Sequence, residues 1–108
     1  MSPITTHVLD SAAGRPADGV SVTLEYRDPS GGWVALGRGR TDIDGRIRDL
    51  LPDDHVLQPG FYQLLFDTSA RSGIFPQVVL RFRVEDPHQH FHLPLLFSPF
   101  AFTTYRGS

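Results

Sequence analysis

Hydrophobic and polar residues alternate along most of this chain with a period of two. Residues 20–27 show the pattern most clearly, because Val20, Val22, Leu24 and Tyr26 are each separated by one polar residue. Successive side chains of a β-strand point to opposite faces, so this alternation is typical of a strand with one buried face. No segment has a convincing helical period, and residues 52–58 or 68–73 would hold a turn of helix at most. The pattern therefore predicts an all-β fold.

Seven or eight short strands follow from this pattern and from the turns between them. Residues 28–32 and the pair Asp44–Gly45 have the composition of tight turns. The predicted strands are residues 4–10, 20–27, a return strand that begins at Trp33, 60–66, 78–84, 90–97 and 101–105. Short strands at regular spacing are typical of a sandwich, so we expect two packed antiparallel sheets. A single domain is predicted over residues 1–108.

Composition and charge exclude several functional classes. The 108 residues are 40% hydrophobic and 20% charged, which is usual for a globular domain, and the formal net charge is -2. This charge gives no basic surface for nucleic acid or for an acidic membrane. The chain has no Cys, so disulfides and thiolate chemistry are excluded. The first residues lack the pattern of a secretory signal and no apolar run approaches the roughly 20 residues of a membrane span, so we expect a cytoplasmic protein.

Three histidines at alternate positions, His88, His90 and His92, form a candidate metal site. On a regular strand all three would point to one face, where three imidazoles can hold zinc and leave a position for water. Against this, Asp86 and Pro87 indicate that His88 still lies in the preceding turn. A solvent-exposed strand face is the simpler interpretation, and the residues alone leave both open.

The last four residues carry many functional groups for the end of a chain: Tyr105, Arg106, Gly107 and Ser108. They follow an aromatic segment, residues 99–104, whose rings we expect to be buried, so an ordered strand should hold the tail. The guanidinium of Arg106 suits a flat, oxygen-rich or anionic ligand. A solvated basic tail is the alternative. His7, Arg46 and His92 are each weak candidates when taken alone.

Four segments taken together resemble the 5-hydroxyisourate hydrolases, which are transthyretin-like enzymes of urate breakdown. They are TTHVLD at 5–10 followed by GRPA at 14–17, TDIDGR at 41–46, HFHLPLLFSP at 90–99, and TTYRGS at 103–108. The resemblance spans nearly the whole chain, and several motifs in the same order rarely match by chance. It implies a transthyretin-like β-sandwich. Residues 68–75 are shorter than the corresponding segment of typical members, so we expect the helix found there to be shortened or absent.

The resemblance also implies an activity and the residues that perform it. The activity is hydrolysis of 5-hydroxyisourate, a planar purine derivative, to 2-oxo-4-hydroxy-4-carboxy-5-ureidoimidazoline, without metal or cofactor. The implied catalytic residues are His7, Arg46 and His92. The implied substrate-binding residues are these three together with Tyr105, Arg106, Gly107 and Ser108. The implied assembly is a homotetramer with active sites where two dimers meet, and the alternatives are a small-ligand carrier and a structural sandwich without catalysis.

The chemistry of these groups suits such a reaction. Hydrolysis needs an activated water, stabilisation of the charge that develops on the carbonyl oxygen, and a proton for the departing nitrogen. His7 and His92 are predicted to act as base and proton shuttle, and the sequence leaves open which does which. Arg46 or Arg106 would stabilise the oxyanion, and Ser108 would orient water or substrate through its hydroxyl or its terminal carboxylate.

Overall fold

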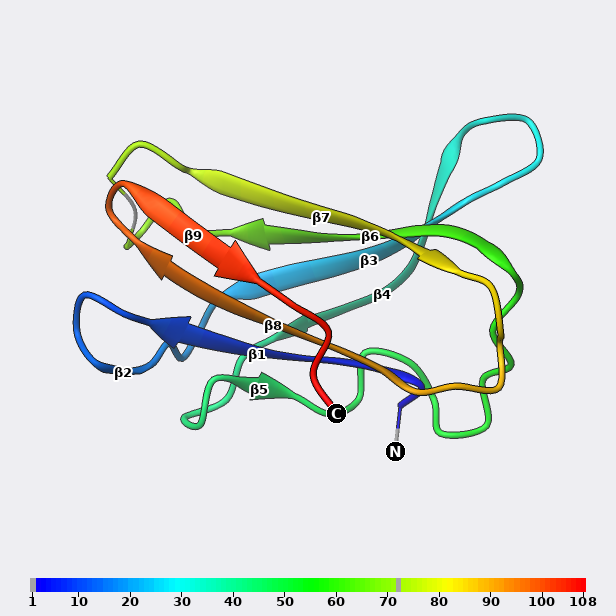
Figure 1. Ribbon diagram of the computed structural model, residues 1–108, viewed down its shortest axis with the longest axis horizontal. Helices are drawn as coiled ribbons and strands as arrows, with labels where there is room; N and C mark the ends of the chain where they lie inside the picture. Colours follow the sequence, from blue (N-terminus) through cyan, green and yellow to red (C-terminus); the bar gives the residue numbers. More distant parts are fainter. Residues whose placement is uncertain (1, 72) are drawn as a thin grey trace.

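The chain folds into two β-sheets (Figure 1). The computed structural model describes residues 2–71 and 73–108. The strands assigned there are β1 (Ile4–Asp10), β2 (Arg15–Pro16), β3 (Ser21–Arg27), β4 (Trp33–Arg40), β5 (Arg46–Ile47), β6 (Gly60–Asp67), β7 (Gln77–Val84), β8 (Phe91–Ser98) and β9 (Ala101–Thr104). The predicted all-β fold class is confirmed, and the two strands that the pattern did not predict, β2 and β5, have two residues each. The described residues contain no helix long and apolar enough to cross a membrane.

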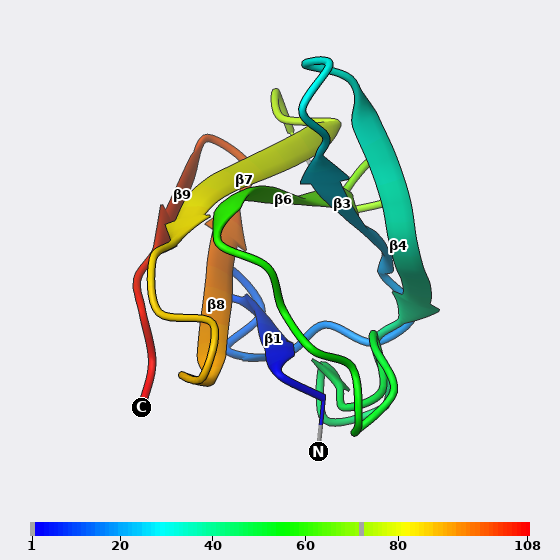
Figure 2. The same ribbon diagram turned by 90° about the vertical axis from the view of Figure 1, so that its right-hand side faces the viewer.

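One sheet has the strand order β2-β1-β8-β9 with β5 also paired to β1, and the other has the order β4-β3-β6-β7. Figure 2 shows β1 and β8 on one side of the sandwich and β3 and β4 on the other. Strands β1 and β8 run parallel, from the pair Ile4–Phe91 to the pair Asp10–Phe97. The prediction of purely antiparallel sheets is therefore wrong for this pair. No hairpin joins β1 to β8, because the whole second sheet lies between them in the chain, so no turn forces them to run in opposite directions.

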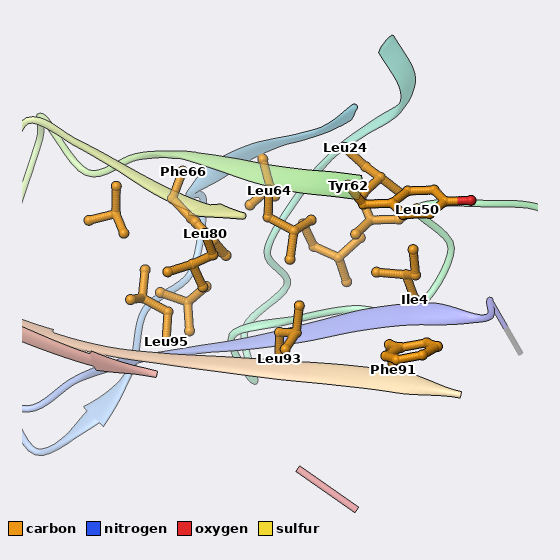
Figure 3. Packing of buried hydrophobic residues seen from close by; sticks show 14 of the residues in the cluster. Ile4, Leu24, Leu50, Tyr62, Leu64, Phe66, Leu80, Phe91, Leu93 and Leu95 are labelled. Carbon is orange, nitrogen blue, oxygen red and sulfur yellow. The ribbon is translucent and has the colours of Figure 1, made fainter. Parts of the chain in front are cut away.

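The core lies between the two sheets and is built from residues at alternate strand positions, including Val22 and Leu24 as the sequence pattern predicted (Figure 3). Ile4 and Val8 of β1 are fully buried, and Leu93 and Leu95 of β8 are also buried. From the opposite sheet the core receives Val22, Leu24, Tyr62, Leu64, Phe66 and Leu80. Because side chains alternate along a strand, the residues between these positions on β1 and β8 point to the outer face of their sheet.

The segment between β6 and β7 contains turns and no helix in its described residues, as expected from its short length. The amide of Arg71 donates to the carbonyl of Thr68 at 3.0 Å, which closes one turn. The guanidinium of Arg71 contacts the carboxylate of Asp18 at 2.9 Å and so ties the segment to the loop before β3. Ser72, which falls within the predicted turn of helix, lies outside the described residues.

The aromatic segment before the tail forms an ordered strand, β9, as predicted, but its rings lie at the surface. Phe100 is 74% exposed and Phe102 is 40% exposed. The prediction that these rings are buried is therefore wrong for the single chain. The reason is that β9 is an edge strand next to β8. An edge strand with exposed rings offers unpaired backbone groups and apolar surface to another chain.

Candidate active site

The three predicted catalytic residues come from three separate strands of one sheet. The parallel register of β1 and β8 places Thr5 opposite His92. The antiparallel pairing of β1 with β5 places His7 opposite Arg46. Paired positions on neighbouring strands share a face, and the buried residues of β1 and β8 occupy the other face. His7, Arg46 and His92 therefore meet on the outer face of the sheet.

A tight turn before β5 sets the position of Arg46. The Asp42 carboxylate accepts hydrogen bonds from the amides of Asp44 and Arg46, both at 2.9 Å. These backbone hydrogen bonds lower the pKa of Asp42, the bond from Arg46 having the larger effect, so the carboxylate stays charged. Gly45 has a φ of 75°, and a Cβ there would lie 2.3 Å from the carbonyl oxygen of Val8. The turn therefore requires glycine at this position and holds β5 close against β1.

The same turn fixes the protonation of His7. The Nε2 atom of His7 lies 2.8 Å from the carbonyl oxygen of Asp44. A carbonyl oxygen only accepts hydrogen bonds, so Nε2 of His7 must carry a proton. In the neutral ring the free lone pair is consequently on Nδ1. His7 is thus held as one tautomer by the loop that also presents Arg46.

His92 is half-buried and has a different environment. Its Nδ1 atom lies 2.8 Å from the hydroxyl oxygen of Thr5. Burial lowers the pKa of His92 below the ordinary value of 6.5, and the positive charges of Arg46, His90 and His7 lower it further. His92 is therefore neutral at neutral pH and leaves Nε2 as the ring nitrogen for a ligand.

An open pocket of about 210 Å³ lies beside these residues on the outer face. Its lining residues are Thr5, Thr6, Arg46, Ile47, Arg48, His90, His92 and Ser108. The pocket thus brings together three predicted site residues, and His7 adjoins it through its pairing with Arg46. Its volume is below the roughly 300 Å³ at which small-molecule sites begin, and one side is open to solvent. A single chain therefore provides only part of an enclosed site.

The C-terminal tail docks on β8 directly beside His92. The amide of Gly107 donates to the carbonyl of His92 at 2.8 Å. A Cβ on Gly107 would lie 2.7 Å from Cδ2 of His92, so the close approach needs glycine. The tail runs back across β8, and this path brings Ser108 to the pocket (Figure 1).

Arg106 lies outside this pocket and holds the tail against the turn before β8. Its guanidinium donates to the side chain of Gln89 at 3.0 Å and to the carbonyl of His90 at 3.1 Å. The same group lies 4.4 Å from the centre of the Phe91 ring, a cation–π contact. Tyr105 is exposed and lines a neighbouring groove with Arg106. The predicted contact of these two residues with substrate stays a prediction.

The alternating histidines do not act as one group. His88 lies in the turn before β8, where its amide donates to the carboxylate of Asp86 at 3.0 Å, as the sequence indicated. The rings of His90 and His92 stack with centres 6.4 Å apart. Among the described residues, no three His, Cys, Asp or Glu side chains are grouped as ligands of a metal ion.

The pocket residues Thr5, Arg48 and His90 received no catalytic or substrate-binding role from the sequence, and His90 was considered only as a metal ligand. Each stands two positions from a predicted catalytic residue, because Thr5 precedes His7, Arg48 follows Arg46 and His90 precedes His92. Residues two apart on a strand share a face, and Arg48 and His90 directly adjoin the ends of β5 and β8. The alternation of side chains along a strand, which predicted buried positions, would therefore also have identified these neighbours of the catalytic residues.

The model of the HIUase/Transthyretin family matches residues 4–107. The chain belongs to the HIUase/Transthyretin family. Among its relatives, the mouse 5-hydroxyisourate hydrolase is 41% identical over 99% of this chain and 96% of its own length. The Arabidopsis thaliana uric acid degradation bifunctional protein TTL is 45% identical over 98% of this chain, which spans only 37% of that protein's length.

Solved structures of the family have the same sandwich. The 5-hydroxyisourate hydrolase of Klebsiella pneumoniae has a TM-score of 0.82 and 34% identity, over 97% of this chain and 98% of that chain. Sea bream transthyretin in complex with thyroxine has a TM-score of 0.89 and 29% identity, over 98% of this chain and 95% of that chain. The transthyretin-like fold predicted from the sequence is thus confirmed.

Replacing Gly107 by Ala tests the docking of the tail. The added Cβ would collide with His92, so we expect the amide of residue 107 to lose its bond to β8 and to exchange its hydrogen roughly tenfold faster. The melting temperature should stay unchanged, because the tail buries little surface. Ser108→Ala is the matched control and should keep this amide protected. Unchanged protection in Gly107→Ala would contradict the docking described here.

Proposed function

We propose that this protein hydrolyses 5-hydroxyisourate to 2-oxo-4-hydroxy-4-carboxy-5-ureidoimidazoline, a step of urate degradation, by metal-independent catalysis with histidine and arginine. The observation that carries the proposal is one pocket in which a neutral imidazole, a guanidinium and the tail hydroxyl meet: His92, Arg46 and Ser108. Relatives named 5-hydroxyisourate hydrolase, which match nearly the whole chain, support it. The reaction's cytoplasmic location stays a prediction.

His92 is the general base of the proposed mechanism. Its Nδ1 atom is engaged by Thr5, so Nε2 is the nitrogen that takes the proton from the attacking water. Its lowered pKa keeps it neutral and able to accept that proton at neutral pH. General base catalysis of this kind contributes roughly 10² to 10⁴ in rate. His7 donates through Nε2 to the Asp44 carbonyl and shuttles protons through Nδ1.

Arg46 stabilises the charge that develops during the reaction. Water adds to the carbonyl carbon and the carbonyl oxygen becomes negative, which the guanidinium opposes by charge and by hydrogen bonds. The C–N bond then breaks, and the departing nitrogen takes a proton from the imidazolium. Ser108 orients the water or the substrate from the far side of the pocket. Gly107 and Arg106 hold the tail that carries this hydroxyl.

We propose that four chains assemble and that the sites lie where two dimers meet. The open pocket supports this proposal, because a second copy of the same face would enclose the substrate. The exposed rings of Phe100 and Phe102 beside an edge strand support it as well.

A small-ligand carrier is the second candidate, favoured by the likeness of the fold to the complex of sea bream transthyretin with thyroxine. The arrangement of His7, Arg46 and His92 argues against it. A site that only binds apolar rings gains nothing from a half-buried base beside a guanidinium, because both must give up water when the ligand enters. Turnover of 5-hydroxyisourate distinguishes the two candidates.

Turnover is measured by the ultraviolet decay of freshly generated 5-hydroxyisourate with and without the protein. We expect the protein to accelerate the decay and a chain that lacks residues 105–108 to be at least about a hundredfold slower, the scale of losing a preorganised group at the site. The shortened chain should melt normally, because these residues are mostly exposed. Dialysis against a chelator should leave the rate unchanged. A shortened chain with the full rate would contradict the proposed role of the tail.

The pH dependence of kcat/KM tests His92 as the base. The rate should fall as pH drops through the pKa of His92, at a midpoint below 6.5, because only the neutral ring accepts a proton. Arg46→Gln removes a positive charge, so the pKa of His92 should rise and the midpoint should move to higher pH. Arg46→Lys keeps the charge and should keep the midpoint despite a slower rate. An equal midpoint in the Gln variant would exclude His92 as the group that titrates.

Sedimentation equilibrium tests the assembly. We expect a mass of roughly four times the 12.1 kDa of one chain. Phe102→Ser should weaken the assembly, because it removes an exposed ring from the edge strand without touching the pocket. A stable, fully active monomer would contradict the proposed closure of the site between chains.

A further inference from the structure

Thr5 lies between two imidazoles on the outer face of the sheet. Its hydroxyl oxygen is 2.8 Å from Nδ1 of His92 and 3.1 Å from Nε2 of His90. The Thr5 residue is only 6% exposed, although it faces away from the core. The two rings stack nearly parallel, at an angle of 13°. One buried hydroxyl therefore holds both histidines.

The number of protons restricts how these three groups can be arranged. A hydroxyl donates one hydrogen bond and accepts two, and each neutral imidazole has one N–H. Thr5 could accept from both rings only if its own buried hydrogen had no acceptor; the two rings are its side-chain partners among the described residues, so Thr5 donates to one ring and accepts from the other. Either Nδ1 of His92 carries the hydrogen and Nε2 of His90 accepts from Thr5, or the roles are reversed. The bridge thus couples the tautomers of the two histidines.

We propose that Thr5 is a positioning residue that holds His92 as the tautomer with its hydrogen on Nδ1, by accepting that hydrogen and donating its own to Nε2 of His90. The proposal rests on the proposed function, because only this tautomer leaves a lone pair on Nε2 for the water proton. The reversed arrangement would place a hydrogen on Nε2 and block the base. When Nε2 takes a proton, no bond of the bridge has to change.

A hydroxyl in this role differs from the carboxylate that orients the histidine of a serine protease. A carboxylate also stabilises the imidazolium and would raise the pKa of the ring. None of the side chains that line this pocket is acidic, and basic side chains lie near the pair on each neighbouring element: His7 on β1, Arg46 on β5, Arg48 after it, and Arg106 in the tail. Of these, Arg48 is paired with the carboxylate of Asp42 at 2.8 Å. Thr5 fixes the tautomer and leaves His92 easy to deprotonate.

Nitrogen NMR of the imidazole rings tests the proposal without substrate. Two-bond proton–nitrogen spectra of histidine-labelled protein distinguish a ring with its hydrogen on Nδ1 from one with its hydrogen on Nε2. We expect His92 to have the Nδ1–H form in the natural protein and in Thr5→Ser, which keeps the hydroxyl. Thr5→Val, which has a similar shape and no hydroxyl, should shift His92 toward the other tautomer. His90→Phe removes the acceptor at an exposed position and should do the same.

Kinetics of the same variants give a second measurement. Thr5→Val should lower kcat roughly tenfold or more with little change in KM. His92 would then be mostly in the tautomer that cannot accept the water proton through Nε2, while the groups that bind substrate remain. Thr5→Ser should restore most of kcat. A purely structural role predicts instead that melting temperature and rate fall together and that the tautomer does not change.

The outcomes separate this proposal from the proposed function. A natural protein with His92 in the Nε2–H form, or a Thr5→Val protein with an unchanged tautomer, would overturn the role of Thr5. If the spectra behave as expected but 5-hydroxyisourate is not consumed, the positioning role is supported and the proposed reaction fails. Should Thr5→Val not fold, His90→Phe and Thr5→Ser decide the matter by the same spectra.

Discussion

The parallel pairing of β1 with β8 is the constraint on which the rest of this site depends. It sets Thr5 opposite His92 and Val8 opposite Leu95 in a single register. Because a strand alternates its faces, a slip of one residue would turn the imidazole of His92 into the core and bring apolar side chains to the surface. The burial of Val8 and Leu95 therefore fixes the register, and the register fixes the distance between the hydroxyl and the base.

Period two in the sequence was sufficient to predict most of the fold. It located the seven longer strands and the buried face of residues 20–27, since burial of alternate side chains is what such a strand needs. It did not predict that β1 and β8 run parallel, because direction depends on how distant segments meet in the sheet. It also missed β5, whose two residues are too few to show a period, although Asp44–Gly45 marked the turn before it.

The site was predicted less completely, for reasons that differ between residues. His7, Arg46 and His92 came from the resemblance and meet on one face, but no spacing in the chain brings positions 7, 46 and 92 together. Arg106 was expected to clamp a ligand; in the single chain it contacts Gln89 in the tail's own support, and its contact with a ligand stays a prediction. A long side chain reaches several neighbours, so its direction cannot be inferred from sequence. The rings of Phe100 and Phe102 show the same limit. Hydrophobicity indicates that burial of a ring is favourable, but not which surface buries it.

No acidic side chain lines the pocket, and this bears on how its parts fit together. Positive charge from Arg46 favours an oxygen-rich ligand and at the same time opposes protonation of His92. A carboxylate hydrogen-bonded to Nδ1 of His92 would raise the pKa of the ring, so a neutral group suits this position. A threonine hydroxyl meets that condition, and it can sit almost fully buried because both of its hydrogen-bonding functions are used. The electrostatics of the pocket and the choice of Thr5 thus follow from one requirement, a base that remains neutral beside a guanidinium.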